Sequence, residues 1–288
     1  MRSRVPGELA DHLPRRYQIR EVLSEGELGG SYLVHDSGLR SARAVLKWQL
    51  LAAHDGDTRT EAEFLEHAAT LRELRHPGIC RSYAHGVLEN AESMRIGYMV
   101  REFVAGTALS ELVAPFVSPA AIQVGIQVAS ALKALHVRSL LCGDLKPANL
   151  IVQRASKSSI DPLSQLVIID LTWRSTQRAQ DATLLDMTLQ YAAPEVMAGA
   201  APDARADLFS LGVLLYWCIT GHLPFEGESL SEILRQQRTR SYTPSNRSGP
   251  SQSDFAARVT SRARSRSLET WERTADARGA PSSSVGWS

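Results

Sequence analysis

Three polar residues that could carry out chemistry on a phosphate lie within six positions of one another, between two apolar runs. They are Asp144, Lys146 and Asn149, in the segment 136–152. An aspartate can accept a proton from a hydroxyl group, a lysine can neutralise a phosphate, and an asparagine carbonyl can bind a hard cation. Transfer of a phosphoryl group to an alcohol uses these three functions. Taken alone, the segment is equally compatible with a polar surface turn.

Two further features near the amino terminus could contact phosphate. The segment 23–34 places glycines between short apolar runs, so its backbone N–H groups could cover a phosphate, although a plain hairpin is the more frequent meaning of such a turn. Lys47 ends the apolar run 44–47. Because lysine is rarely buried without a partner, Lys47 is either a surface residue at the end of a strand or a cation placed for binding.

Apolar periodicity predicts the elements that would hold these residues. Strand-like segments alternate with helical ones, and the strand at 166–169 ends directly before Asp170. We expect strands within 17–50 and at 96–104 and 166–169, and helices over 61–74, 118–136 and 207–220. The Ser-rich stretch between 152 and 166 is interpreted as a solvated loop.

The composition favours a globular protein in a reducing compartment. A formal net charge of +1 implies no bulk attraction to nucleic acid or to an acidic membrane surface. The three cysteines are odd in number and widely spaced, which argues against a disulfide framework or a metal site. The longest apolar run, 211–219, is too short to span a bilayer, and residues 1–20 lack the apolar core of a signal peptide. We therefore expect a cytoplasmic protein.

The last 60 residues differ in composition from the rest of the chain. Residues 229–288 contain ten arginines, no lysine, five acidic residues and many serines, with no sustained apolar period. This pattern favours a disordered extension over a tail that binds an anionic partner.

Taken in order, these segments resemble the signature motifs of protein kinases, most closely those of the bacterial Ser/Thr kinases. The resemblance covers roughly residues 17–230. It rests on the Gly-rich turn at 23–31, the strand lysine at 44–47, the catalytic loop at 142–149, the metal-binding motif at 170–172, the Ala-Pro-Glu end of the activation segment at 193–195 and the helix at 207–212.

The resemblance implies an α+β, two-lobed fold with a β-rich N-lobe, an α-helical C-lobe and ATP bound at their junction. The expected organisation is a leader over 1–16, the N-lobe over 17–104, a partial C-lobe over 105–228 and a disordered tail over 229–288. The C-lobe is expected to be incomplete because no match to the last kinase helices is visible after Leu234. The implied function is transfer of the ATP γ-phosphate to a Ser or Thr hydroxyl of a protein substrate. The alternative is a nucleotide-binding pseudokinase that acts as a scaffold or regulatory module.

The resemblance also implies a role for each matching residue. Asp144 would orient and deprotonate the acceptor hydroxyl, and Lys146 would stabilise the transferring phosphate. Asn149 and Asp170 would hold Mg²⁺. The residues expected to bind ATP are Lys47, at the α- and β-phosphates, Gly26 and Gly29 of the Gly-rich turn, Leu23, Val45, and the hinge residues Glu102 and Phe103.

Several positions depart from the family pattern. The helix glutamate that normally pairs with the strand lysine is replaced by His67, so Glu63 or Glu66 would have to substitute for it. Gly143 stands where an arginine normally reads a phosphate on the activation segment, and Cys142 replaces a histidine that supports the metal motif. We expect Cys142 to be a packed structural residue.

Three other departures concern the nucleotide and the C-lobe. Arg101 occupies the position beside the adenine pocket, where a cation is hard to desolvate unless it finds a carboxylate. Thr172 replaces the usual glycine of the metal motif. Glu195 is expected to lack its usual arginine partner unless an arginine of the tail supplies it.

Overall fold

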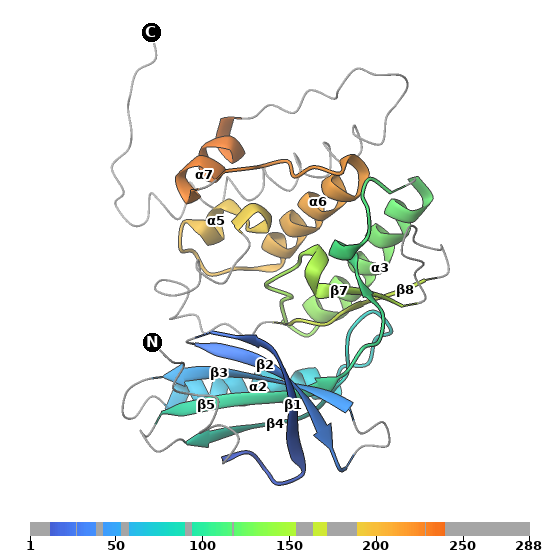
Figure 1. The fold of residues 1–288 in the computed structure, drawn as a ribbon. Coiled ribbons are helices and arrows are strands. Elements are labelled where there is room, and N and C mark those ends of the chain that lie inside the picture. Colours follow the sequence, from blue (N-terminus) through green and yellow to red (C-terminus); the bar gives the residue numbers. More distant parts are fainter. Residues whose placement is uncertain are drawn as a thin grey trace, which may run out of the picture. The chain divides into compact units, whose positions relative to one another are not determined.

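The computed structural model divides the chain into two compact units, and the division falls after Ala105. The first unit is dominated by an antiparallel sheet with a helix, and the second is mainly helical (Figure 1). This architecture confirms the predicted α+β, two-lobed fold. The structure describes residues 12–26, 28–38, 43–52, 58–89, 94–116, 118–153, 164–171, 189–227 and 229–239. The predictions for Thr172, for the Ser-rich loop and for most of the tail therefore fall outside the described residues.

The sheet of the first unit has five antiparallel strands in the order β1-β2-β3-β5-β4. Side chains alternate between its two faces, as the pleat of a strand requires. One face carries an apolar core that includes Tyr32, Leu46 and Trp48. The strands are β1 (Tyr17–Glu25), β2 (Gly29–Asp36), β3 (Arg43–Ala52), β4 (Ser82–Glu89) and β5 (Arg95–Glu102).

Helix α2 (Thr58–Glu73) covers the opposite face of this sheet. Its Phe64 packs so closely over Gly97 that a Cβ atom at Gly97 would lie 2.8 Å from the Phe64 ring. Gly97 pairs with Gln49 across β3 and β5, and Lys47 lies two residues from Gln49 on the same face. The strand alternation therefore places Lys47 on the face that α2 covers.

The end of the predicted leader belongs to the first unit. Leu13 is buried in the apolar core of the sheet, and the guanidinium of Arg16 donates two hydrogen bonds to Asp36, at 2.9 and 2.8 Å. Burial would raise the pKa of Asp36, but the bonds from Arg16 and Gly38 outweigh it and lower that pKa. Residues 12–16 are thus part of the folded lobe rather than a separate leader.

The second unit is built on two long helices, α3 (Ser118–His136) and α6 (Ala204–Thr220), which pack against each other. Helix α6 is apolar around most of its circumference, as expected for a buried helix. Asp203 caps its first turn by accepting from the Arg205 N–H at 2.8 Å, and Gly221 ends it with a φ of 76°. Smaller elements complete the unit: β6 (Thr107–Ala108), β7 (Leu150–Gln153), β8 (Gln165–Ile168), the short helix α5 (Pro194–Met197) and α7 (Leu230–Thr239).

Strands β6, β7 and β8 form a small antiparallel sheet in that order. Gln127 of α3 holds the start of β8, because its side-chain amide donates to Ser164 O at 3.0 Å and accepts from Leu166 N at 2.9 Å. The hairpin of β7 and β8 is thereby fixed to α3, and Asp170 follows directly after it.

The folded part of the chain extends beyond the predicted boundary at 228. Helix α7 occupies residues 230–239, where the composition suggested a disordered tail. Its few apolar residues suffice because Ile233 is buried against the core formed by Tyr191, Phe209 and Phe225. Within the described part of the chain, no helix is long and apolar enough to cross a membrane.

Candidate active site

The structure brings together the three residues that the sequence singled out in the segment 136–152. Lys146 Nζ lies 2.7 Å from Asp144 Oδ2, and these side chains are 19% and 14% exposed. The Asn149 amide nitrogen donates to Asp144 Oδ2 at 2.9 Å and to Asp144 O at 2.8 Å. Because Nδ2 makes both bonds, Oδ1 of Asn149 is directed away from Asp144 as an acceptor. A short 3₁₀ turn, Pro147–Asn149, produces this close approach.

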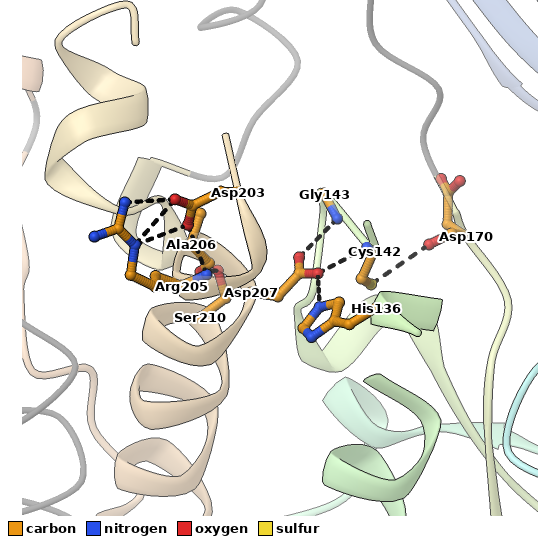
Figure 2. Close-up of polar contacts among 9 residues, drawn as sticks. All are labelled: His136, Cys142, Gly143, Asp170, Asp203, Arg205, Ala206, Asp207 and Ser210. Carbon is orange, nitrogen blue, oxygen red and sulfur yellow. Dashed lines mark hydrogen bonds and ion pairs between the residues drawn. The ribbon is translucent and has the colours of Figure 1, made fainter. Parts of the chain in front are cut away.

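A single buried carboxylate from α6 anchors the loop that carries Asp144 (Figure 2). Asp207 Oδ2 lies 2.8 Å from His136 Nε2 and accepts from Cys142 N at 2.9 Å. Its other oxygen, Oδ1, accepts from Gly143 N at 2.9 Å. Asp207 is only 3% exposed. Three donors from another part of the chain thus converge on one side chain and define the path of the loop immediately before Asp144.

Cys142 links this loop to the segment that holds Asp170. The thiol is completely buried, and Sγ lies 4.0 Å from the backbone oxygen of Asp170 (Figure 2). The N–H of Ile169 also donates to Asn149 O at 3.0 Å. Burial, with a smaller contribution from Asp207, raises the pKa of the Cys142 thiol well above its ordinary value. Cys142 therefore remains a protonated, packed residue that supports the backbone at Asp170.

Gly143 adopts a left-handed conformation with a φ of 75°. A glycine accepts this conformation without the steric cost that a Cβ atom would add. The backbone N–H of Gly143 contributes to the anchor at Asp207, but no side chain at this position can contact a phosphate.

The Gly-rich turn of the first unit is a tight connection between β1 and β2. The N–H of Gly26 donates to Gly29 O at 2.9 Å. A Cβ atom at Gly29 would lie 2.8 Å from Trp48 O, and one at Gly30 would lie 2.8 Å from Ser24 O and from Trp48 Nε1. The close approach to β3 therefore requires glycine at both positions. Sequence reasoning assigned no role to Gly30, because only the packing against Trp48 reveals it.

The other residues predicted to bind the nucleotide lie on neighbouring strands of the same sheet. Lys47 is partly buried and pairs with Ser31 of β2 and Met99 of β5. Val45 is on the same face as Lys47, and Leu23 of β1 is 47% exposed.

The predicted hinge follows strand β5. The N–H of Glu102 donates to Arg81 O at 2.8 Å, and Glu102 Oε2 accepts from Arg81 N at 3.2 Å. The guanidinium of Arg43 lies 4.5 Å from the centre of the Phe103 ring, in a cation–π contact. Arg101, directly before the hinge, is only 5% exposed. Glu102 is therefore held by Arg81, directly before β4, and Phe103 by Arg43 of β3.

His67 occupies the helix position at which the family pattern has a glutamate. Its Nε2 atom is buried and makes no hydrogen bond to any described residue. Burial lowers the pKa of His67 to about 4, so the ring is neutral at physiological pH. The alternative carboxylates are directed elsewhere, because Glu63 accepts from Arg59 at 2.9 Å and Glu66 is exposed.

The buried imidazole predicts a specific dependence of stability on pH. Between pH 6.5 and about 4 the unfolded chain binds a proton at His67 that the folded chain does not, so acidification destabilises the fold. The free energy of unfolding should fall by about 2 kcal/mol between pH 7 and pH 5 through this residue. Urea unfolding of wild type and His67→Gln at both pH values measures it. The loss should be smaller in the variant, whereas His222→Gln, at an exposed site, should behave as wild type. Equal losses in all three proteins would contradict the prediction.

The sheet and helix of the first unit, and the anchored Asp144 loop of the second, define the fold of a protein kinase. The family model of the protein kinase domain matches residues 17–271, and the chain belongs to this family. The match extends well into the Arg/Ser-rich stretch, in which no resemblance was visible after Leu234.

Bacterial kinases are among the curated proteins to which this chain is similar. The chain is 30% identical over 239 residues to the serine/threonine-protein kinase PknB of Mycolicibacterium smegmatis, which covers 82% of this chain and 37% of the relative. It is 31% identical over 228 residues to PknB of Mycobacterium tuberculosis, covering 78% and 36%. It is 28% identical over 250 residues to the serine/threonine-protein kinase pkn2 of Myxococcus xanthus, covering 84% and 29%. The chain thus spans about a third of the length of these relatives.

Proposed function

We propose that this chain is a protein kinase that transfers the γ-phosphate of ATP to a serine or threonine hydroxyl of a protein substrate. The observation that carries the proposal is the cluster in which Lys146 and Asn149 lie 2.7 and 2.9 Å from the Asp144 carboxylate, on a loop anchored by Asp207. Phosphoryl transfer depends mainly on the positioning of reactants and on charge stabilisation, which this arrangement supplies.

The charges of the cluster suit the two reacting groups, the acceptor hydroxyl and the phosphoryl group. Asp144 is the carboxylate available to orient the acceptor hydroxyl and take its proton. The ammonium of Lys146, 2.7 Å away, presents a positive charge where the phosphoryl group would arrive. A lysine at this position, two residues after the aspartate, favours serine and threonine over tyrosine as acceptors, in agreement with the names of the bacterial relatives.

The donor set of the loop also fits Mg²⁺, which prefers carboxylate and carbonyl oxygens. Asn149 donates through Nδ2 and so leaves Oδ1 as a ligand, and the partly buried carboxylate of Asp170 supplies a second oxygen. When bound, the cation would neutralise charge on the phosphates of ATP. The contact of Asn149 with Asp144 would orient the amide oxygen, and the contact of Cys142 would position the backbone that carries the Asp170 side chain.

The residues of the first unit are proposed to bind ATP itself. Lys47 would contact the α- and β-phosphates, and the backbone of the turn at Gly26 and Gly29 would cover them. Leu23, Val45 and the hinge residues Glu102 and Phe103 would contact the adenosine part of the nucleotide.

A radiometric assay with ATP, Mg²⁺ and a generic basic protein substrate tests the proposal. Wild type should transfer phosphate to serine or threonine, and Lys47→Met should abolish transfer by removing the phosphate contact. Binding of nucleotide to wild type without any transfer would overturn the kinase proposal in favour of the pseudokinase alternative, for which the relatives give no support.

From the glycine at position 143 we predict that activity does not depend on phosphorylation of the activation segment. No cation stands at position 143 to bind a phosphate on Thr176 or Thr183, so a phosphate there should gain no charge-assisted contact with the catalytic loop. Activity should differ by less than about twofold between fully phosphorylated and phosphatase-treated protein, compared by mass spectrometry and peptide kinetics. A rise of tenfold or more on phosphorylation would contradict this prediction.

A further inference from the structure

Gln237 makes an unusual contact with the end of the activation segment. Its side chain is fully buried, and its amide nitrogen donates to the backbone oxygen of Ala192 at 3.1 Å. Ala192 immediately precedes the Ala193-Pro194-Glu195 motif. A buried glutamine is uncommon, and a hydrogen bond from it to the main chain specifies one backbone position.

Other contacts of helix α7 fix its position and therefore the position of Gln237. The neighbouring Gln236 donates to Glu226 O and accepts from Glu226 N, the latter at 3.1 Å. Ile233 is buried in the same core as Tyr191. The helix therefore packs against the turn Leu189–Tyr191 and against α5 with little freedom to shift.

The carbonyl oxygen of Tyr191, one residue before Ala192, is bound by a side chain of helix α6. Ser210 Oγ of α6 lies 2.8 Å from Tyr191 O and 3.1 Å from Ala206 O, so its hydroxyl proton is shared between the two. Consecutive main-chain oxygens, at Tyr191 and Ala192, thus bind one side chain from α6 and one from α7. Both contacts use neutral donors that require no modification and no ligand.

Switched kinases order this segment through new pairs between a phosphate and arginine. Here the catalytic loop has Gly143 in place of such a cation, whereas Ser210 and Gln237 hold the end of the segment through neutral hydrogen bonds. We propose that Gln237 is a positioning residue that keeps residues 191–193 in the conformation used during transfer to protein substrates, without phosphorylation. The expected effect on phosphate transfer rests on the proposed kinase function, whereas the expected effect on the conformation of residues 191–193 does not.

Replacing Gln237 by methionine, which keeps the volume and removes the donor, tests this role. Loss of one buried hydrogen bond should lower kcat/KM for a peptide substrate by about 5- to 10-fold. The KM for ATP should change by less than about twofold, since Ala192 is not one of the residues proposed to bind ATP or Mg²⁺. Hydrogen exchange of the amides at 191–196 should become faster, and the control Ser231→Ala, on the exposed side of α7, should leave all three quantities unchanged.

A second variant, Gln237→Glu, separates positioning from simple packing. Its carboxylate cannot donate to Ala192 O, but a protonated carboxyl group can. Its peptide kcat/KM relative to wild type should therefore be lowest near pH 8 and recover toward pH 6, while that of Gln237→Met stays constant. Unchanged exchange at 191–196 in both variants would overturn the proposal. Wild type that transfers no phosphate would instead overturn the proposed function, and the exchange measurement would still decide the role of Gln237.

Discussion

Asp144→Asn will lower kcat by about 10²- to 10⁴-fold, the range that a positioned general base contributes. The variant keeps the size of the side chain and can still accept from Asn149, so the loop should retain its path. It cannot take a proton, and it removes the negative charge that lies 2.7 Å from Lys146. Single-turnover transfer from radiolabelled ATP measures the effect, and the KM for ATP should change little.

Asp203→Asn is a matched control for this experiment. Asp203 caps α6 by accepting from the Arg205 N–H, and asparagine caps helices as well as aspartate does. The same chemical change at that site should leave kcat within about twofold of wild type. If Asp144→Asn and Asp203→Asn had equal activities, Asp144 would not be the base.

Asp207→Ala is the second change with a large expected effect, and it acts first on stability. Three donors, at His136, Cys142 and Gly143, would lose their common acceptor in a buried environment. We expect the free energy of unfolding to fall by about 3–4 kcal/mol, because buried donors left without partners are costly. Urea denaturation followed by tryptophan fluorescence gives this value.

Kinetics should separate Asp207→Ala from an ordinary destabilising variant. At a temperature at which the variant is still folded, kcat should remain depressed because the loop before Asp144 has lost its anchor. Asp207→Asn keeps one acceptor oxygen and should lie between Ala and wild type in both stability and kcat. Full activity of folded Asp207→Ala would show that Asp144 is positioned by other contacts.

The sequence predicted best those features that are determined by residues close to one another in the chain. The helix over 118–136 was predicted with the bounds that α3 has, because its start at Ser118 and Pro119 is a local signal. Asp144, Lys146 and Asn149 could be grouped because six consecutive positions contain them. Their proposed catalytic roles remain predictions that the assays above will test.

The contacts that sequence reasoning missed join distant positions or contradict local composition. The resemblance implied that the helix at 207–212 anchors the catalytic loop, but nothing in the residues around His136 indicates that its ring contacts the Asp207 carboxylate, 71 positions later. Strand β4 was missed because its residues are mostly half-buried and show no clean alternation. Helix α7 was missed because its sequence is rich in arginine and glutamine, and only a narrow face, which includes Ile233 and Gln237, is buried.

The anchor at Asp207 also constrains the order in which this protein can fold. The main-chain donors at Cys142 and Gly143 meet a partner that is synthesised 65 and 64 residues later. Closing so long a loop costs entropy, and this cost must be met before the contacts can stabilise the fold. On the ribosome, the loop that carries Asp144 therefore cannot form these contacts until α6 has emerged, so a nascent chain contains the proposed catalytic residues before it contains the anchor of their loop.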